Sequence, residues 1–411
     1  MKFFVNQSNP DVNSNVISLE QQLPNLVDLY SDFGMWLQYG ETLYYSGSSS
    51  LNECGLGFKM INQDSTFKKV TALQGEIQQI AGGGGHTLIL QKDGCLWVFG
   101  NNRQGQLGLG YYSESEGKPE PLKKAQINGK VIRVAAGFGF SLVQTEEGLW
   151  STGANNRGYL GLKHNDHVNS FQQVQGLEGE VRLLAAGDSH SLAVIGDDLW
   201  VCGNNRHGQL GLGHKHDCNS FQHVAGLQGN ILQIAAGDNF SLVLTTEGLF
   251  GCGQNDSGQL GIGDNTDDET RNCKEFKKAI GLDGKKILQI DAGHRHSVIL
   301  TEQEVMVSGS NYSGQLGLGL PCKRECYFDT FQKVESIKAN EVLRVKAGFS
   351  HTAVLTKYAL LTCGGNLHTQ LGFKFDADEY YLNTFTKVEA LPDVIKDYFS
   401  LKPIQKEFKL G

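Results

Sequence analysis

Residues 181–213 read VRLLAAGDSHSLAVIGDDLWVCGNNRHGQLGLG, and this stretch decides the fold. It contains three short apolar runs, which are separated by turns rich in glycine, aspartate and asparagine. The first run ends at Gly187, the second ends at Ile195, and the third leads into a glycine-rich signature that starts at Gly203. Short apolar runs separated by such turns are typical of antiparallel strands joined by tight connections. The stretch therefore predicts an antiparallel meander.

The same pattern occurs seven times in the 411 residues of the chain. Its signature glycine recurs every 50 to 56 residues, at Gly55, Gly108, Gly161, Gly211, Gly261, Gly317 and Gly372. A period near fifty with about four short strands per copy indicates radial repetition. We predict an all-β, seven-bladed β-propeller that forms a single domain over residues 1–411. The repeats are placed at about residues 25–58, 77–110, 131–163, 181–213, 231–263, 287–319 and 342–373.

Composition excludes several classes of function. A net charge of −8 and a pI near 5.9 argue against a protein that binds nucleic acid through its phosphates. No apolar run is long enough to span a bilayer, and the first residues lack the pattern of a conventional signal peptide. Nine scattered cysteines, several of them in apolar runs, suit a reducing compartment. We expect a cytoplasmic monomer that binds neither nucleic acid nor membrane; a nuclear location and secretion of a bacterial effector into a host cell are alternatives.

Glycine and alanine positions predict how each blade is built. We expect the glycine that ends the first run, such as Gly187, to adopt a positive φ. The signature glycine, such as Gly211, is expected where a Cβ would obstruct the next blade. The small pair Ala185-Ala186 predicts that the first strand is innermost, and the outermost strand is placed at segments such as 171–174.

The two ends of the chain carry further strand-like segments. They are Val16–Leu19 with Leu26–Leu29 near the start, and Phe385–Val388 with Val394–Phe399 near the end. We expect the ends to meet in the ring, with strands from both helping to close it, because closure removes an open sheet edge.

One face of the ring is the candidate binding face. Successive turns of a meander alternate between the two ends of the strands, so the first and third turns of every repeat share one face. First-turn residues differ between repeats two to seven: Gly84-Gly85, Phe138-Gly139, Asp188-Ser189, Asp238-Asn239, His294-Arg295 and Phe349-Ser350. Exposed aromatic and charged side chains around one rim suit a protein partner. The alternative is that these loops vary without consequence.

Arginines in the third turns extend this prediction. Arg103, Arg157 and Arg206 are assigned to one equivalent position in three consecutive repeats. Beside Asp188 and Asp238 they would form a cationic arc that recognises an acidic or phosphate-bearing surface. The alternative is that they only stack on the next blade.

The sequence does not indicate covalent chemistry. Four histidines recur at one position of the repeat: His86, His190, His296 and His351. Because Phe140 and Phe240 hold this position in two other repeats, we favour packing over a metal or catalytic role. Cys322 and Cys326 lack a second Cys/His pair nearby, which argues against zinc. No nucleophile elbow, P-loop or paired-carboxylate motif occurs, so we expect no catalytic residue, metal or cofactor.

The combined motif, A-G-x-x-H/F-S/T followed by G-x-N-x-x-G-Q-L-G, resembles the repeat of the regulator of chromosome condensation family over about residues 25–400. The resemblance implies a seven-bladed propeller. Members of this family include exchange factors for the small GTPase Ran, chromatin and ubiquitin-ligase modules, a plant ultraviolet receptor, a bacterial inhibitor protein and bacterial effectors that act on host GTPases. The receptor needs many stacked tryptophans, and this chain has four, so that function is discarded.

The family also suggests which residues contact a partner. In the Ran exchange factors, acidic and histidine residues of the A-G-x-x-H turns face the GTPase. By that motif Asp188 and His190 match best, Asp238 follows, and His296 or His351 are later candidates. The sequence departs from the exchange factor in two ways: the third turn at 204–208 lacks the wedge insertion, and the basic chromatin-binding tail is absent. The longer loops at 111–126, 264–278 and 321–330 lie on the same face and are candidates to replace the wedge.

We therefore expect a protein-binding propeller that acts as a guanine nucleotide exchange factor-like regulator of a small GTPase, with Ran as the first candidate. The alternative is a non-catalytic scaffold or inhibitor-type propeller that binds another protein. The predicted partner-binding residues are Asp188, His190, Asp238, Phe138, His294, Arg295, Phe349, Arg103, Arg157 and Arg206.

Overall fold

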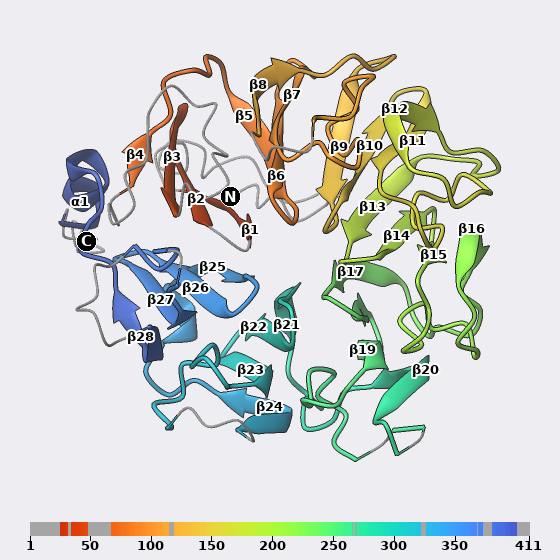
Figure 1. Ribbon diagram of the computed structural model, residues 1–411. Coiled ribbons are helices and arrows are strands. Elements are labelled where there is room, and N and C mark those ends of the chain that lie inside the picture. Colours follow the sequence, from red (N-terminus) through yellow and green to blue (C-terminus); the bar gives the residue numbers. More distant parts are fainter. Residues whose placement is uncertain are drawn as a thin grey trace, which may run out of the picture.

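Seven four-stranded antiparallel sheets form a closed ring in the computed structural model (Figure 1). The structure describes residues 25–31, 34–47, 67–114, 119–264, 266–267, 269–321, 326–367, 369–372 and 380–400. Within each sheet the strand order follows the order along the chain, so each blade is one contiguous meander. The prediction of an all-β, seven-bladed propeller is confirmed.

The blades are numbered in chain order. Blades 1 and 2 consist of β1 (Asn25–Ser31), β2 (Gly34–Tyr39), β3 (Thr42–Gly47) and β4 (Lys68–Lys69), then β5 (Ile77–Gly82), β6 (His86–Gln91), β7 (Leu96–Gly100) and β8 (Glu120–Lys124). Blades 3 and 4 consist of β9 (Val131–Ala136), β10 (Phe140–Thr145), β11 (Gly148–Gly153) and β12 (Val168–Gln173), then β13 (Val181–Ala186), β14 (His190–Ile195), β15 (Asp198–Gly203) and β16 (Cys218–His223).

Blades 5 and 6 consist of β17 (Ile231–Ala236), β18 (Phe240–Thr245), β19 (Gly248–Gln254) and β20 (Asn272–Lys278), then β21 (Ile287–Ala292), β22 (His296–Thr301), β23 (Val305–Ser310) and β24 (Tyr327–Lys333). Blade 7 consists of β25 (Val342–Ala347), β26 (His351–Thr356), β27 (Leu360–Gly365) and β28 (Tyr381–Lys387), preceded by a 3-10 turn at Ala339–Glu341 and followed by helix α1 (Asp393–Ser400). Among the described residues, no helix has the length and apolar character needed to cross a bilayer.

The first strand of each blade lines the centre of the ring, as predicted. Each first strand contacts the first strands of both neighbouring blades, and β25 contacts β1. A side-chain amide links several of these neighbours: Gln79 Nε2 donates to the carbonyl oxygen of Val134 at 2.7 Å, and the Val134 N–H donates to Gln79 Oε1 at 3.1 Å. Gln233 makes similar bonds to blade 6, to the Leu288 carbonyl oxygen and the Ile290 N–H, and Gln289 makes them to Leu343 and Val345 of blade 7. These amides join the first strands of neighbouring blades, which belong to separate sheets.

The hydrophobic core lies between neighbouring blades. The second strand of blades 2 to 7 is buried along its whole length, because it is covered on both faces. At the signature glycine the blades approach closely: a Cβ on Gly211 would lie 2.4 Å from Phe276 of the next blade's outermost strand. Gly108, Gly161 and Gly261 face the equivalent phenylalanines in the same way. The predicted reason for this glycine is confirmed.

Gly187 is a glycine for a different reason from the one expected. Its φ is not positive, so that prediction was wrong. A Cβ there would instead lie 2.3 Å from the carbonyl oxygen of Gly237 in the next blade, and Gly293 faces Gly348 at the same distance. First turns of adjacent blades are therefore in backbone contact near the axis, where there is no room for a side chain.

Blades 1 and 7 lie side by side and close the ring (Figure 1). Met35, Leu37 and Phe67 of blade 1 share an apolar cluster with Leu355 and Val388 of blade 7. Within the described residues each of these two sheets is built from one end of the chain, so they close the ring by packing face against face. The predicted segment Val16–Leu19 lies outside the described residues.

The segment Val394–Phe399, predicted as a strand, belongs to helix α1, so that prediction was wrong. Ile395 is fully buried, and Phe399 packs against the same cluster one helical turn later. A spacing of four residues puts two side chains on one face of a helix and also of a strand, so this pair of apolar residues did not distinguish the two. The helix covers the seam between blades 1 and 7 at the outer edge of the ring (Figure 1).

Candidate functional site

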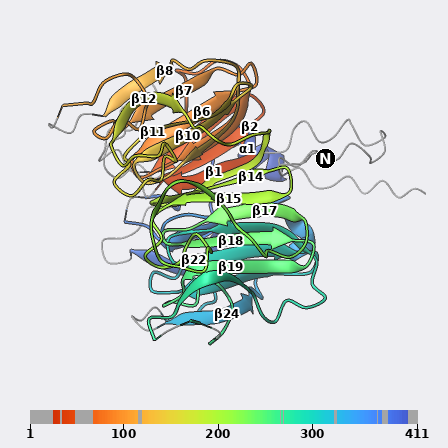
Figure 2. The same ribbon diagram turned by 90° about the vertical axis from the view of Figure 1, so that its right-hand side faces the viewer.

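The strands run across the thickness of the ring, so the connections lie on its two faces (Figure 2). In blade 4 the first turn, at 187–189, and the third connection, at 204–217, lie at one end of the strands. The second turn, at 196–197, lies at the other end. We call the face that carries the first turns and third connections the first-turn face.

Three first-turn side chains from consecutive blades meet near the centre of this face. Asp188 of blade 4, Asp238 of blade 5 and His294 of blade 6 have polar atoms that all lie within 4.8 Å of one another. His294 Nε2 is 2.6 Å from Asp238 Oδ2. The three residues, which we call the central cluster, converge because the first turns of adjacent blades are in backbone contact. The cluster is also compact enough for one cation, although the short His294–Asp238 distance is that of a direct hydrogen bond between the two side chains.

Asp238 is a largely covered anion rather than a fully exposed one. Its side chain is only 14% exposed, which corrects the expectation that it projects freely into solvent. Burial acts to raise the pKa of its carboxyl, but hydrogen bonds with His294 and Asp188 and the charges of His294 and Arg295 outweigh burial, so that the pKa is lowered. Asp238 is therefore ionised at neutral pH and is held in one position by its neighbours.

The predicted aromatic residues flank the central cluster. The Phe349 ring stacks on the His294 ring with centroids 4.1 Å apart and planes 14° apart, and the His294 N–H donates to the Phe349 carbonyl oxygen at 3.3 Å. On the other side the Phe138 N–H donates to the Asp188 carbonyl oxygen, also at 3.3 Å. The structure thus brings Phe138, Asp188, Asp238, His294 and Phe349 into one arc over blades 3 to 7.

Arg295 lies beside this arc and makes an ion pair with a residue that the sequence analysis missed. Arg295 Nη1 is 3.4 Å from Asp256 Oδ2 in the third turn of blade 5, and both side chains are about two-fifths exposed. Asp256 holds the third-turn position at which the sequence prediction named only arginines. Comparing all repeats at that position would have found it.

The three third-turn arginines do not form the predicted arc. In blades 2 to 7 one glycine of the third strand pairs with the histidine or phenylalanine that starts the second strand. Arg103 and Arg206 lie three residues after this glycine and are equivalent, whereas Arg157 lies four residues after it. The assignment of Arg157 to the same position was therefore wrong; its place is held by Asn156. Arg103 and Arg206 are exposed.

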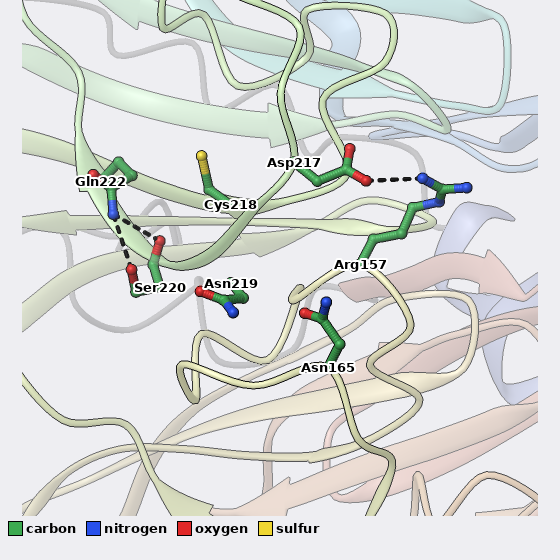
Figure 3. A pocket seen from close by; sticks show the side chains of 7 residues that line it. All are labelled: Arg157, Asn165, Asp217, Cys218, Asn219, Ser220 and Gln222. Atoms are coloured by element: carbon green, nitrogen blue, oxygen red, sulfur yellow. Dashed lines mark hydrogen bonds and ion pairs between the residues drawn. The ribbon is translucent and has the colours of Figure 1, made fainter.

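Arg157 points toward the neighbouring blade (Figure 3). Its Nη1 lies 2.8 Å from Asp217 Oδ2 of blade 4. The pair sits in a shallow pocket between blades 3 and 4, which is also lined by Asn165, Cys218, Asn219, Ser220 and Gln222. Because its charge is matched by Asp217, Arg157 links two blades and adds little positive potential to the face.

His190 is inside the protein, which corrects its assignment to the partner surface. It has no exposed area, and its Nε2 lies 2.9 Å from Ser241 Oγ in the next blade. His86 and His296 make the same contact with Ser141 and Thr352 of the blades that follow them. The packing interpretation of the histidine position agrees with this burial.

Burial also keeps these histidines neutral. It lowers the pKa of His86, His190 and His351 to about 4, and that of His296 to about 3. His351 differs from the others because neither of its ring nitrogens has a hydrogen-bond partner. The next blade is blade 1, where Met35 holds the position that carries Ser or Thr elsewhere.

Comparison with known proteins agrees with the fold. The family described as RCC1-like domain matches residues 35–401. The chain is 37% identical over 127 residues to the secretion-regulating guanine nucleotide exchange factor of Bos taurus, which covers 30% of this chain and 26% of that protein. It is 32% identical over 335 residues to the X-linked retinitis pigmentosa GTPase regulator of Homo sapiens, which covers 80% of this chain and 27% of that protein. The chain thus spans about a quarter of the length of these relatives.

Solved structures show the same architecture. Yeast RCC1 (Prp20) bound to Kap60 superposes with a TM-score of 0.72 at 19% identity, over 95% of this chain and 91% of that one. Human WBSCR16 superposes with a TM-score of 0.66 at 25% identity, over 79% of this chain and 84% of that one. Given the family match over residues 35–401, the chain belongs to the RCC1-like domain family.

Proposed function

We propose that this propeller binds a small GTPase with its first-turn face and acts as a guanine nucleotide exchange factor-like regulator, with Ran as the first candidate. The observation that carries the proposal is the arc of first turns from Phe138 to Phe349, which joins a fixed acidic centre to aromatic side chains. The relatives named above include a guanine nucleotide exchange factor and a GTPase regulator, which supports the same class of partner.

The chemistry of the central cluster suits a nucleotide-free GTPase. An exchange factor accelerates release by binding the nucleotide-free form more tightly than the loaded form. In P-loop proteins a lysine and backbone N–H groups hold the nucleotide phosphates, and they lose these partners when the nucleotide leaves. Asp188 and Asp238 would offer carboxylates to such a basic site and would repel the phosphates. Because His294 already holds Asp238 in place, little conformational freedom is lost on binding.

One observation favours the alternative of a non-catalytic platform. The third turn of blade 4 is closed by a hydrogen bond from the Gly208 N–H to the Asn205 carbonyl oxygen at 2.9 Å. Blades 3 and 5 have the same bond, at 3.0 Å, from Gly158 and Gly258. The turn in blade 4 therefore has the ordinary shape, and no additional segment projects from it to displace a nucleotide. A platform would hold its partner without changing nucleotide release.

The release of a fluorescent nucleotide from a panel of small GTPases, Ran first, separates the two functions. We expect the wild-type chain to accelerate release from one of them, and the double variant Asp188→Asn/Asp238→Asn to lose this effect. Asparagine is used rather than a lysine or arginine, because the Asp238 side chain is largely covered and asparagine keeps its size. Losing charged contacts inside an interface costs roughly 2–5 kcal/mol, so the affinity should fall at least about thirtyfold.

The matched control is Asp197→Asn, on the opposite face of blade 4, where the side chain is 82% exposed. It should leave both binding and release unchanged. Binding without accelerated release would favour the platform, and failure of every GTPase to bind would refute the proposal.

A further inference from the structure

Large apolar side chains are exposed on the first-turn face of blades 6 and 7. The exposed fractions are 54% for Tyr312, 40% for Leu320, 39% for Phe349, 71% for Leu367 and 57% for Tyr380. We call these five residues the aromatic surface. Soluble proteins seldom leave a contiguous apolar patch open to water unless it binds something.

The aromatic surface is continuous across the boundary between the two blades. The Gly319 N–H of blade 6 donates to the carbonyl oxygen of Asn383 in blade 7 at 2.7 Å, and Asn383 Nδ2 donates to the Leu320 carbonyl oxygen at 3.3 Å. Within blade 7 the Asn366 N–H donates to the Tyr380 carbonyl oxygen at 2.8 Å, which places Leu367 beside Tyr380. These bonds bring Leu320, Leu367 and Tyr380 to the blade boundary. A Cβ on Gly365 would lie 2.7 Å from Ser350 Oγ and 3.6 Å from the Cβ of Ser313, so the turns that carry Phe349 and Tyr312 meet at the same boundary.

The fold does not require apolar residues here. Tyr312 and Leu367 hold the third-turn position that lies three residues after the strand-ending glycine. At this position the other described blades carry polar or charged residues, namely Arg103, Asn156, Arg206 and Asp256. Since the same turn forms with all of these side chains, the turn itself does not require the apolar residues of blades 6 and 7.

The aromatic surface also adjoins the central cluster. Phe349 belongs to the aromatic surface and stacks on His294, which is paired with Asp238. A stable protein interface covers about 800 Å² per partner, or roughly 20–30 residues, which the few side chains of the central cluster cannot supply. Binding energy concentrates on aromatic anchors near such charged groups, so the interface has a reason to extend toward blades 6 and 7.

We propose that the aromatic surface is the second part of the interface with the small GTPase, and that it takes an apolar patch of that GTPase next to its nucleotide site. This inference rests on the proposed function. The central cluster would act on the basic site exposed by nucleotide loss, and the aromatic surface would supply most of the affinity and select among GTPases by their apolar contacts.

The test uses the double variant Tyr312→Asn/Leu367→Asn, which gives both positions the residue that blade 3 carries there. The control is Tyr358→Asn, since Tyr358 is 43% exposed in the second turn of blade 7, on the opposite face. Affinity for the nucleotide-free GTPase, taken from the panel above, is measured by calorimetry, and circular dichroism checks that each variant is folded. We expect the double variant to bind at least tenfold more weakly and the control to bind as the wild type does.

Four results would overturn the inference. If the double variant binds normally while Asp188→Asn/Asp238→Asn does not, the aromatic surface lies outside the interface and the proposed function stands. If Tyr358→Asn weakens binding as much as the double variant does, the aromatic surface has no special role. If the wild-type chain binds no GTPase, both proposals fail. If sedimentation shows a wild-type dimer that the double variant abolishes, the aromatic surface binds a second copy of the chain instead.

Discussion

The buried histidines should make the stability of the ring depend on pH in a way that one substitution can change. His86 is fully buried, and burial lowers its pKa from 6.5 to about 4. In the unfolded chain the imidazole is hydrated and titrates near its ordinary value of about 6.5. Unfolding therefore takes up a proton between pH 6.5 and about 4. The contribution of His86 is fully present above pH 6.5 and is lost as the pH falls through this window.

The size of the effect follows from the shift. A pKa lowered from 6.5 to about 4 corresponds to about 3 kcal/mol for one histidine. In the middle of the window nearly one proton is taken up, so the free energy of unfolding changes by about 1.3 kcal/mol per pH unit. His190, His296 and His351 are shifted in the same direction for the same reason. Together the four histidines should make the stability of the ring fall steeply in mild acid.

The substitution His86→Phe removes the titrating group and keeps the packing, because Phe140 and Phe240 hold the same position without exposure in blades 3 and 5. Urea unfolding measured at intervals between pH 4 and 7 should show a slope against pH that is lower by about 1.3 kcal/mol per pH unit. The triple variant His86→Phe/His190→Phe/His296→Phe should lose about three times as much.

Ser141→Ala is the control, since it removes the hydroxyl that lies 2.9 Å from His86 Nε2 and leaves the imidazole in place. It should lower the stability at every pH and leave the slope nearly unchanged, because burial rather than this hydrogen bond is the main cause of the low pKa. A slope that stays the same in the triple variant would refute the reasoning.

Three further predictions concern packing, closure and charge. Gly211→Ala should lower the free energy of unfolding by about 1–3 kcal/mol more than Gly226→Ala, because both glycines have a positive φ but only Gly211 would place a Cβ against Phe276; equal losses in urea unfolding would contradict this. Deleting residues 384–411 removes most of β28 and all of α1 from the closing seam, so the melting temperature should fall, and an unchanged melting curve would count against the packing described here. With a net charge of −8, the purified chain should not shift naked or nucleosomal DNA at physiological salt, and a tight shift would show a basic surface that the sequence does not indicate.

The repeat itself determines the features that recur in every blade. The number of blades, the order of their strands and the position of the signature glycine could all be predicted from the spacing of short apolar runs and glycines. The reason is that each blade forms by hydrogen bonds between strands that are consecutive in the chain. The sequence of one repeat is therefore enough to predict its meander. The buried position shared by His190 and Phe240 was likewise visible in the repeat, because only packing accepts both side chains.

Only the tertiary structure decided what happens between blades. Asp188, Asp238 and His294 lie about fifty residues apart in the chain, and they meet because the ring is narrow enough for its first turns to touch at glycines. The same closeness buries Asp238, which a single repeat would leave exposed. The place of Arg157 in its turn follows from counting residues after Gly153, but its pairing with Asp217 of the next blade could be seen only in the ring. Among the described residues, two features occur only at the seam between blades 7 and 1. The ring of His351 lacks a hydrogen-bond partner because blade 1 has Met35 where the other blades have Ser or Thr, and helix α1 packs on the seam.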